Sequence, residues 1–374
     1  MTSSQPHAGS DRITNLDTVR GVATLGILVM NAISFGLIDA AYFNLDAAGS
    51  RSWLDWIIGG LGEVFIDQKT MALFSLLFGV GMVVFIERAE AKGVAALRLS
   101  LWRNLLLLGI GLAHALVWDG DVLTVYAICA PIVLLLRRRN PVTLLGLGTA
   151  ALLSSAVAAV MTQTAVPATG EGLGSFWYAD GGAIGDAVGL FLISDFFLRA
   201  LGMMLIGVAL YRLDVVQGTR PPAFYRSMVR WGLAIGLPLT MAGLAWQVAE
   251  GFSPNVSVAG LAPNTLATIP MALAYVGLIS LWNQRTTTAL HVRVRAVGRM
   301  ALTNYLAQTV LGIVALRVVL ERGDLTRSGI AAFVLGAWVL QLLWSKPWLE
   351  RFRFGPIEWL WRSATYRTWQ PLRR

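Results

Sequence analysis

Charged residues and cysteines are both scarce in this sequence of 374 residues. Asp, Glu, Lys and Arg make up 14% of it, and hydrophobic residues make up 56%. Soluble domains carry about 25% charged residues, so this composition excludes an ordinary soluble protein and indicates several membrane-spanning helices. The only cysteine, Cys129, lies in an apolar segment. A single cysteine excludes an intrachain disulfide and a cysteine-based zinc cluster.

The first apolar segment lacks the features of a cleaved signal peptide. It is longer than a signal peptide and ends without a clear cleavage site, so we expect a retained membrane helix. Residues 1–14 begin with small polar side chains and predict a disordered tail. Residues 15–345 predict a single transmembrane helical domain, and residues 346–374 predict a basic, aromatic cytoplasmic tail.

Ten apolar segments are long enough to cross a hydrocarbon core about 30 Å thick. They are residues 19–38, 69–87, 103–118, 121–137, 142–160, 192–211, 229–249, 264–282, 298–317 and 329–345. Residues 53–67 form a segment shorter than a membrane span, with three glycines and three carboxylates. They predict an interfacial or re-entrant helix. The predicted fold class is therefore an all-α integral membrane protein with about ten transmembrane helices and one additional helix.

Lys and Arg are missing from some of the loops that connect these segments. Residues 161–191 and 250–263 contain neither, whereas the loops on the opposite side are rich in arginine. Basic loops remain in the cytoplasm, so we predict that both termini are cytoplasmic and that the protein lies in the cell membrane. The net charge of +9 is then an orientation signal. We expect the lipid bilayer and not nucleic acid as a partner, and a homo-oligomer is compatible with the sequence.

Polar side chains recur at membrane depth, where they are costly unless they pair or line a wet cavity. Asn31 follows Arg20 by eleven residues, which places its amide roughly 16 Å into the bilayer. The outer half of the predicted bundle holds several ionisable side chains, with Asn31 and two further amides beneath them. These residues are His114, Asp121, Lys69, Asp195 and Arg199, and the two amides are Asn304 and Gln308. In one interpretation the charged residues form separate ion pairs, Asp67 with Lys69 and Asp195 with Arg199. In the other, the whole set of polar residues forms one substrate-binding site.

His114 is the only histidine within a predicted membrane segment. A carboxylate from the turn at Asp119 to Asp121 could orient its ring, and the ring would then serve as a general base. The alternative is a structural histidine whose hydrogen bonds are satisfied. No second histidine or cysteine accompanies it, so we expect no metal site. No G-x-S-x-G motif is present, which argues against a serine nucleophile.

Three arginines at the cytoplasmic ends of predicted helices are candidates for binding the phosphates of a donor molecule. They are Arg20, Arg103 and Arg299. Guanidinium groups bind phosphate through paired N–H donors. The alternative is that these arginines serve only as orientation signals and attract anionic lipids.

Several motifs resemble the YeiB-like membrane proteins, a family catalogued as a domain of unknown function. The matching stretches are NLDTVRG at 15–21, GILVMN at 26–31, LFSLLFGVG at 73–81, RNLLLLGIGLAH at 103–114, GDVLTVY at 120–126, GRMALTNYLAQ at 298–308, GPIEWLWR at 355–362 and QPLRR at 370–374. The family is grouped with transmembrane acyltransferases, including the lysosomal heparan-alpha-glucosaminide acetyltransferase. In that enzyme an asparagine matching Asn31 is followed, eleven residues later, by a functional histidine. This sequence has Tyr42 there, so a histidine role passes to His114 or is absent.

The resemblance implies transfer of an acyl group from a cytoplasmic acyl-CoA-like donor to a small-molecule, lipid or glycan acceptor at the outer face. In this hypothesis Asn31, His114 and Asp121 are catalytic, and acyl-CoA is a co-substrate without any tightly bound cofactor. A second hypothesis is a transporter or exporter of a small anionic metabolite, with Lys69 and Arg199 as anchors and Asp195 or Asp121 as the proton-coupling group. A third is a structural or partner-binding protein.

Overall fold

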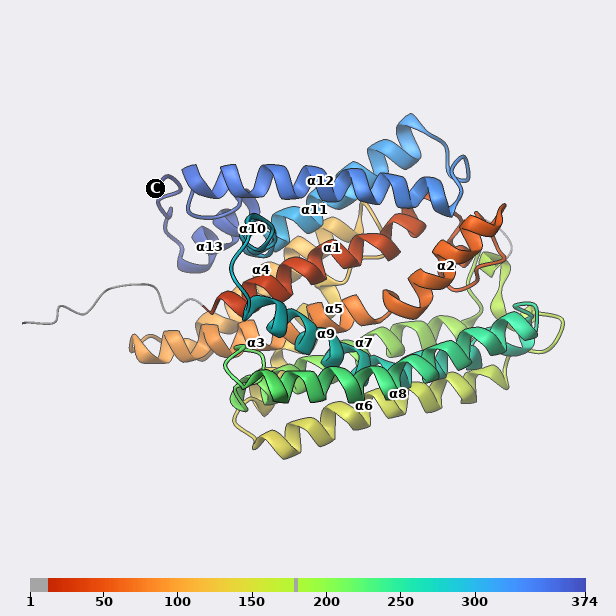
Figure 1. The fold of residues 1–374 in the computed structure, drawn as a ribbon, viewed down its shortest axis with the longest axis horizontal. Helices are drawn as coiled ribbons and strands as arrows, with labels where there is room; N and C mark the ends of the chain where they lie inside the picture. The colour runs from red at the N-terminus through yellow and green to blue at the C-terminus, as the bar shows by residue number, and fades with distance from the viewer. Residues whose placement is uncertain (1–12, 178–180) are drawn as a thin grey trace, which may run out of the picture.

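The protein is a bundle of α-helices in the computed structural model, which describes residues 13–177 and 181–374 (Figure 1). The expected disordered tail at 1–14 lies almost entirely outside the described residues. Thirteen α-helices are present in the described ranges, and no β-sheet forms there. They are α1 Thr14–Gly36, α2 Trp53–Phe65, α3 Lys69–Ala91, α4 Ala96–Ala115, α5 Leu123–Leu136, α6 Pro141–Gln163, α7 Asp186–Arg212, α8 Pro222–Ala249, α9 Ala262–Asn283, α10 Ala289–Arg299, α11 Ala301–Ile313, α12 Arg327–Arg351 and α13 Pro356–Tyr366. The prediction of an all-α membrane protein is confirmed.

Nine helical stretches in the described residues are long and apolar enough to cross a membrane. One of them joins α2 and α3, but the two helices are separated at Ile66 to Gln68, where Gln68 has a positive φ of 61°. With 13 residues, α2 alone is shorter than a membrane span. It therefore corresponds to the predicted additional helix. The apolar helix α5 is also short, with 14 residues.

The predicted span at 298–317 differs from the structure. It is divided between the end of α10 and α11, with a break at Met300, and its last residues form a single π-helical segment, Val314–Val319. Average hydropathy does not report such a break, because Met300 is as apolar as its neighbours. Helix α12 continues to Arg351, six residues beyond its predicted end.

Local sequence signals explain several of the helix ends. Ser52 and Asp55 form a reciprocal capping box at the start of α2. Asn140 accepts a hydrogen bond from the Thr143 amide at 2.7 Å, and Pro141 begins α6. These side chains satisfy amides that the first turn of a helix leaves without partners.

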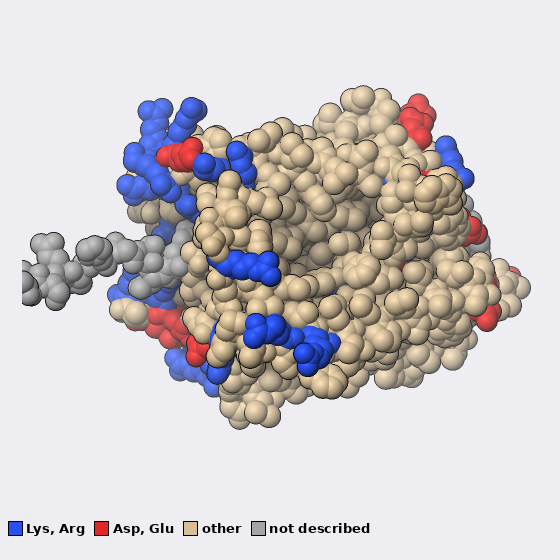
Figure 2. All heavy atoms as spheres, in the orientation of Figure 1, with Lys and Arg blue, Asp and Glu red and all other residues tan. Residues whose placement is uncertain are grey.

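Charge separates the two ends of the bundle. Lys and Arg gather at the end that carries α13 and the C-terminus, whereas Asp and Glu predominate at the opposite end (Figure 2). Helix α1 also starts at the basic end. By the positive-inside rule the basic end is cytoplasmic, so the described chain is a multi-pass membrane protein with its C-terminus inside.

Close helix packing fixes the position of α3 against α7. A Cβ atom at Gly79 would lie 2.4 Å from the backbone oxygen of Met204, and one at Gly207 would lie 2.2 Å from that of Leu76. Both distances are shorter than real contacts, so α3 and α7 approach backbone to backbone only because both positions are glycine.

The C-terminal residues fold back onto the bundle. Helix α13 packs against α4 and α11. The indole of Trp359 donates to the backbone oxygen of Gln370 at 2.7 Å, and Phe352 pairs with Arg373 in an isolated antiparallel bridge. Residues 346–374 therefore continue α12 and then supply one side of the cytoplasmic end.

Candidate functional site

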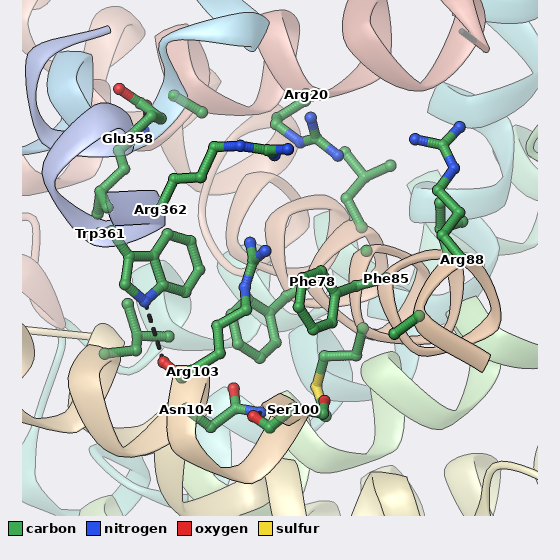
Figure 3. Close-up of a pocket in the computed structure, with 18 of the residues that line it drawn as sticks. Arg20, Phe78, Phe85, Arg88, Ser100, Arg103, Asn104, Glu358, Trp361 and Arg362 are labelled. Atoms are coloured by element: carbon green, nitrogen blue, oxygen red, sulfur yellow. Dashed lines mark hydrogen bonds between the residues drawn. The ribbon is translucent and has the colours of Figure 1, made fainter. Parts of the chain in front are cut away.

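A pocket of about 510 Å³ opens at the cytoplasmic end of the bundle (Figure 3). Helices α1, α3, α4, α11 and α13 form its walls, α5 contributes its first residue and α10 its last two. Six basic side chains and one carboxylate, Glu358, line it. The basic residues are Arg20, Arg88, Lys92, Arg103, Arg299 and Arg362. The structure thus brings all three predicted donor-binding arginines into one pocket and adds three more cations.

Arg103 is held between two aromatic rings. Its guanidinium carbon lies 4.4 Å from the ring centre of Phe85 and 4.0 Å from that of Trp361, and the Trp361 indole donates to the Arg103 backbone oxygen at 2.9 Å. Among the described residues, no acceptor is hydrogen-bonded to the Arg103 guanidinium. Stacking uses the faces of the planar guanidinium and leaves its N–H edge available for an anion in the pocket.

The carboxylate of Glu358 is committed to a helix terminus. It accepts hydrogen bonds from the amides of Leu302 at 2.7 Å and Thr303 at 3.0 Å, in the first turn of α11. Burial raises the pKa of Glu358, and the hydrogen bonds from Thr303 act in the opposite direction. A carboxylate at this position stabilises the N-terminus of α11. Because Glu358 is engaged there, the six basic side chains dominate the charge of the pocket.

The inner end of the pocket is apolar. Phe74, Phe78, Leu107 and Leu123 line it. The Phe74 ring stacks on Tyr126 with 5.9 Å between centroids and lies 6.3 Å from Tyr305. Both tyrosines are fully buried. We call Phe74, Tyr126 and Tyr305 the aromatic layer, in which Phe74 lines the pocket and the two tyrosines pack behind it.

His114 lies on the other side of Tyr305, with 5.3 Å between the two ring centres. Its Nδ1 is 2.8 Å from Asp121 Oδ1, and its Nε2 is 2.9 Å from the Thr309 hydroxyl. Asp121 Oδ2 accepts from the amide of Thr124 at 2.8 Å and from its hydroxyl at 2.9 Å. Because a carboxylate accepts, Nδ1 of His114 carries a proton, and in the neutral ring Nε2 accepts from Thr309. The histidine and aspartate that the sequence suggested as a pair are therefore hydrogen-bonded.

Asn31 is buried, with 8% of its surface exposed. Within the described part of the chain, its side chain has no hydrogen-bond partner. One turn further along the same face of α1, the Ser34 hydroxyl accepts from the Trp118 indole at 3.0 Å and Phe35 lies 4.8 Å from the Trp118 ring. The Trp118 ring is 5.8 Å from that of His114. The helical period therefore directs Asn31 toward the same region, one turn deeper in the membrane.

Lys69, Asp195 and Arg199 belong to a separate set of contacts, which we call the outer ionic cluster together with Asp67 and Asn264. Lys69 Nζ donates to the Glu63 backbone oxygen at 2.7 Å and also to Asn264 Oδ1, whose amide nitrogen donates to Asp67 Oδ2 at 2.7 Å. Asp195 pairs with Arg199 and accepts from Ser155. Asn264 thus links Lys69 to Asp67, whereas Asp195 and Arg199 form a direct ion pair.

Tyr42 lies close to this outer ionic cluster. Burial raises the pKa of its hydroxyl, the charges of Asp67 and Asp195 raise it further, and that of Arg199 lowers it. Tyr42 is therefore a neutral phenol close to buried charges.

Asn304 and Gln308 connect α11 to neighbouring helices. Asn304 donates to Ser345 at 3.1 Å and accepts from the Trp344 indole at 2.7 Å. Gln308 donates to the Thr24 backbone oxygen at 2.8 Å and to Gln341 at 3.0 Å. Asn304 thus bonds to α12 and Gln308 to both α1 and α12, so a role in holding the bundle together accounts for them.

Sequence reasoning missed the contribution of α13 to the pocket. Trp361 and Arg362 lie more than 250 residues from Arg103 in sequence, and only the fold brings them together. The available signal was the GPIEWLWR motif, in which Pro356 can start a helix and Glu358 can cap another. Thr309, the partner of His114 Nε2, had no signal beyond its position one residue after Gln308.

The fold and its charge distribution define a multi-pass α-helical membrane protein with an amphiphilic pocket at its cytoplasmic end. Residues 210–368 match the family described as "Protein of unknown function (DUF418)". The chain is 33% identical to the uncharacterized protein YeiB of Escherichia coli (strain K12), over 96% of this chain and 98% of the relative. It is 31% identical to the uncharacterized protein YxaH of Bacillus subtilis (strain 168), over 100% and 98%. The chain belongs to this YeiB-like family.

Proposed function

We propose that this protein is a transmembrane acyltransferase. It would take an acyl group from a cytoplasmic acyl-CoA-like donor and transfer it to a hydroxyl or amine of an acceptor at the outer face of the cell membrane. The pocket is the observation that carries this proposal. Its arginines suit the phosphates of the donor, and its apolar inner end, closed by the aromatic layer against which His114 packs, suits an acyl group.

The donor orientation follows from the polarity of the pocket. Phosphates would bind at the arginines, where charge-assisted hydrogen bonds to guanidinium are strong. The thioester would then point toward Phe74, Leu107 and Leu123. Movement of the aromatic layer would bring the thioester carbonyl to His114, because Tyr305 contacts both Phe74 and the His114 ring.

The reaction assigns a role to each inner polar group. The acceptor hydroxyl or amine would displace the Thr309 hydroxyl from His114 Nε2. Nε2 would then accept the acceptor's proton while the acceptor's oxygen or nitrogen forms a bond to the thioester carbon. Asp121 would hold the ring and stabilise the imidazolium that forms. The amide N–H of Asn31 would donate to the developing oxyanion. Collapse of the intermediate breaks the carbon–sulfur bond, and His114 returns the proton to the departing thiolate.

A two-stage experiment tests the proposal. Purified protein in detergent is first titrated with CoA and then incubated with acetyl-CoA and an extract of outer-face lipids and glycans, with release of free thiol as the readout. We expect saturable binding by the wild type and by His114→Gln, but thiol release by the wild type only. His291→Gln, which removes a buried histidine of α10, is the matched control and should retain turnover. Absence of CoA binding, or equal turnover in His114→Gln and wild type, would contradict the proposal.

The outer ionic cluster favours a second candidate, a proton-coupled transporter of a small anion. Buried charges beside a broken helix are found at transport sites, and α2 and α3 are separated at Gln68 next to Lys69. Asp195 would then carry the proton and Arg199 the anion. Proton-driven uptake into proteoliposomes that is lost in Asp195→Asn would support this function. Uptake that is unaffected by that change would exclude it.

A further inference from the structure

Two uncharged polar side chains lie in the wall that α4 contributes to the pocket, beside the charged Arg103. Ser100 and Asn104 are one helical turn apart, and Figure 3 shows both on the pocket wall near Arg103. Ser100 is 1% exposed and Asn104 is 6% exposed. Along α4 they flank Arg103, with Ser100 three residues before it and Asn104 one residue after it, and Leu107 lies one turn deeper.

Neither side chain has satisfied its hydrogen-bonding capacity within the protein. Asn104 Nδ2 donates to the Ser100 backbone oxygen at 2.8 Å. In the described ranges, however, no partner exists for Asn104 Oδ1 or for the Ser100 hydroxyl. Both atoms belong to pocket-lining residues, so a ligand that fills the pocket must pair with them or leave them without a hydrogen bond once water is displaced.

The chemistry of the two groups identifies what they would bind. Asn104 Oδ1 accepts from an N–H, and the Ser100 hydroxyl donates to a carbonyl oxygen. An amide offers both. A hydrocarbon chain offers neither, so a fatty acid or the tail of an anionic phospholipid would leave both groups unpaired. The ligand therefore has an anionic head, an amide at the depth of Asn104, and an apolar end.

We infer that Ser100 and Asn104 form an amide-binding subsite that recognises the pantetheine arm of the donor. This inference rests on the proposed function and names the part of the donor that gives the pocket its selectivity. The arginines bind the phosphates, the Ser100–Asn104 subsite binds an amide of the arm, and the apolar inner end of the pocket receives the acyl end. A thioester on a pantetheine arm is thereby distinguished from a membrane lipid that carries the same negative charge.

Two probes separate the subsite from the rest of the pocket. CoA carries the phosphates and the arm, whereas adenosine 3′,5′-bisphosphate carries phosphates without the arm. Both are titrated by calorimetry against wild type, Asn104→Leu, Ser100→Ala and the double variant. Leu105→Ala, on the exposed side of the same helix, is the matched control. Thermal unfolding of each variant verifies that it is folded.

We expect the affinity for CoA to fall about 3- to 10-fold for each single variant and more for the double variant, as for lost neutral hydrogen bonds. The affinity for the bisphosphate should change less than 2-fold in all of them, and Leu105→Ala should match wild type with both probes. Equal weakening of both probes would overturn the inference, because it would show a structural effect on the whole pocket. Unchanged CoA affinity would also overturn it while leaving the proposed function standing. Absence of binding of either probe to wild type would instead remove the proposed function, and the inference with it.

Discussion

Replacement of Arg103 by alanine tests the pocket most sharply, because its side chain is positioned by stacking and not by a carboxylate. A charge-assisted hydrogen bond is worth about 1.5–3 kcal/mol, so Arg103→Ala should weaken CoA binding about 10- to 150-fold. The lost contacts with Phe85 and Trp361 should also lower the stability of the protein, at about 0.5–1 kcal/mol each. Arg103→Lys keeps the charge but loses the planar stack, so its affinity should be intermediate.

The assay is a calorimetric titration of CoA at fixed ionic strength, with thermal unfolding measured in parallel. Arg138→Ala is the matched control, because it removes the same charge from the same end of the bundle. Its side chain is 74% exposed and pairs with Glu90 outside the pocket lining. We expect less than a 2-fold effect from it. Equal losses of affinity in Arg103→Ala and Arg138→Ala would refute the reasoning, since binding would then reflect only the net charge of the cytoplasmic face.

Three further predictions concern packing, chemistry and pH. Gly79→Ala should destabilise the protein by about 1–3 kcal/mol through overpacking against Met204. Gly81→Ala, which has open space around it, is the control. We expect a lower melting temperature for Gly79→Ala only, and equal melting temperatures would contradict the packing argument. His114→Gln should reduce turnover about 100- to 10,000-fold with little change in CoA affinity, and a parallel loss of both would assign the histidine to structure. Burial raises the pKa of Glu358 above its ordinary 4.5, so the folded state holds this proton more tightly than the unfolded chain. Stability should therefore decline as the pH rises from about 4.5 through the raised pKa, and Glu358→Gln should flatten that part of the stability profile; an unaltered profile would contradict this assignment.

The sequence predicted the local features of the fold well. The pairing of His114 with Asp121 could be anticipated because the two residues flank a short turn between antiparallel helices, so their separation in space is fixed by seven residues of chain. The cytoplasmic placement of Arg20, Arg103 and Arg299 followed from the charge of the loops. Their convergence on one pocket did not, because loop charge gives only the side of the membrane.

Contacts between distant segments were the part that the sequence did not determine. Depth alone placed Lys69 and Asp195 beside His114, but depth does not fix the face of the bundle on which a residue lies. Asn264 and Ser155 complete their contacts from other helices. Trp361 likewise reaches Arg103 only because α13 folds back, and that packing depends on the carboxylate of Glu358 at the start of α11.

Transfer of an acyl group across the membrane is the central claim, and sealed inside-out vesicles test it directly. Acetyl-CoA labelled in its acetyl group is added outside, where it meets the cytoplasmic face, and covalently bound label is measured in the lumen. The account predicts labelled acceptor in the lumen of vesicles that contain the wild type or His291→Gln, and none with His114→Gln. The account would be contradicted if wild-type vesicles that contain the acceptor extract left the acetyl-CoA outside intact and their lumen unlabelled.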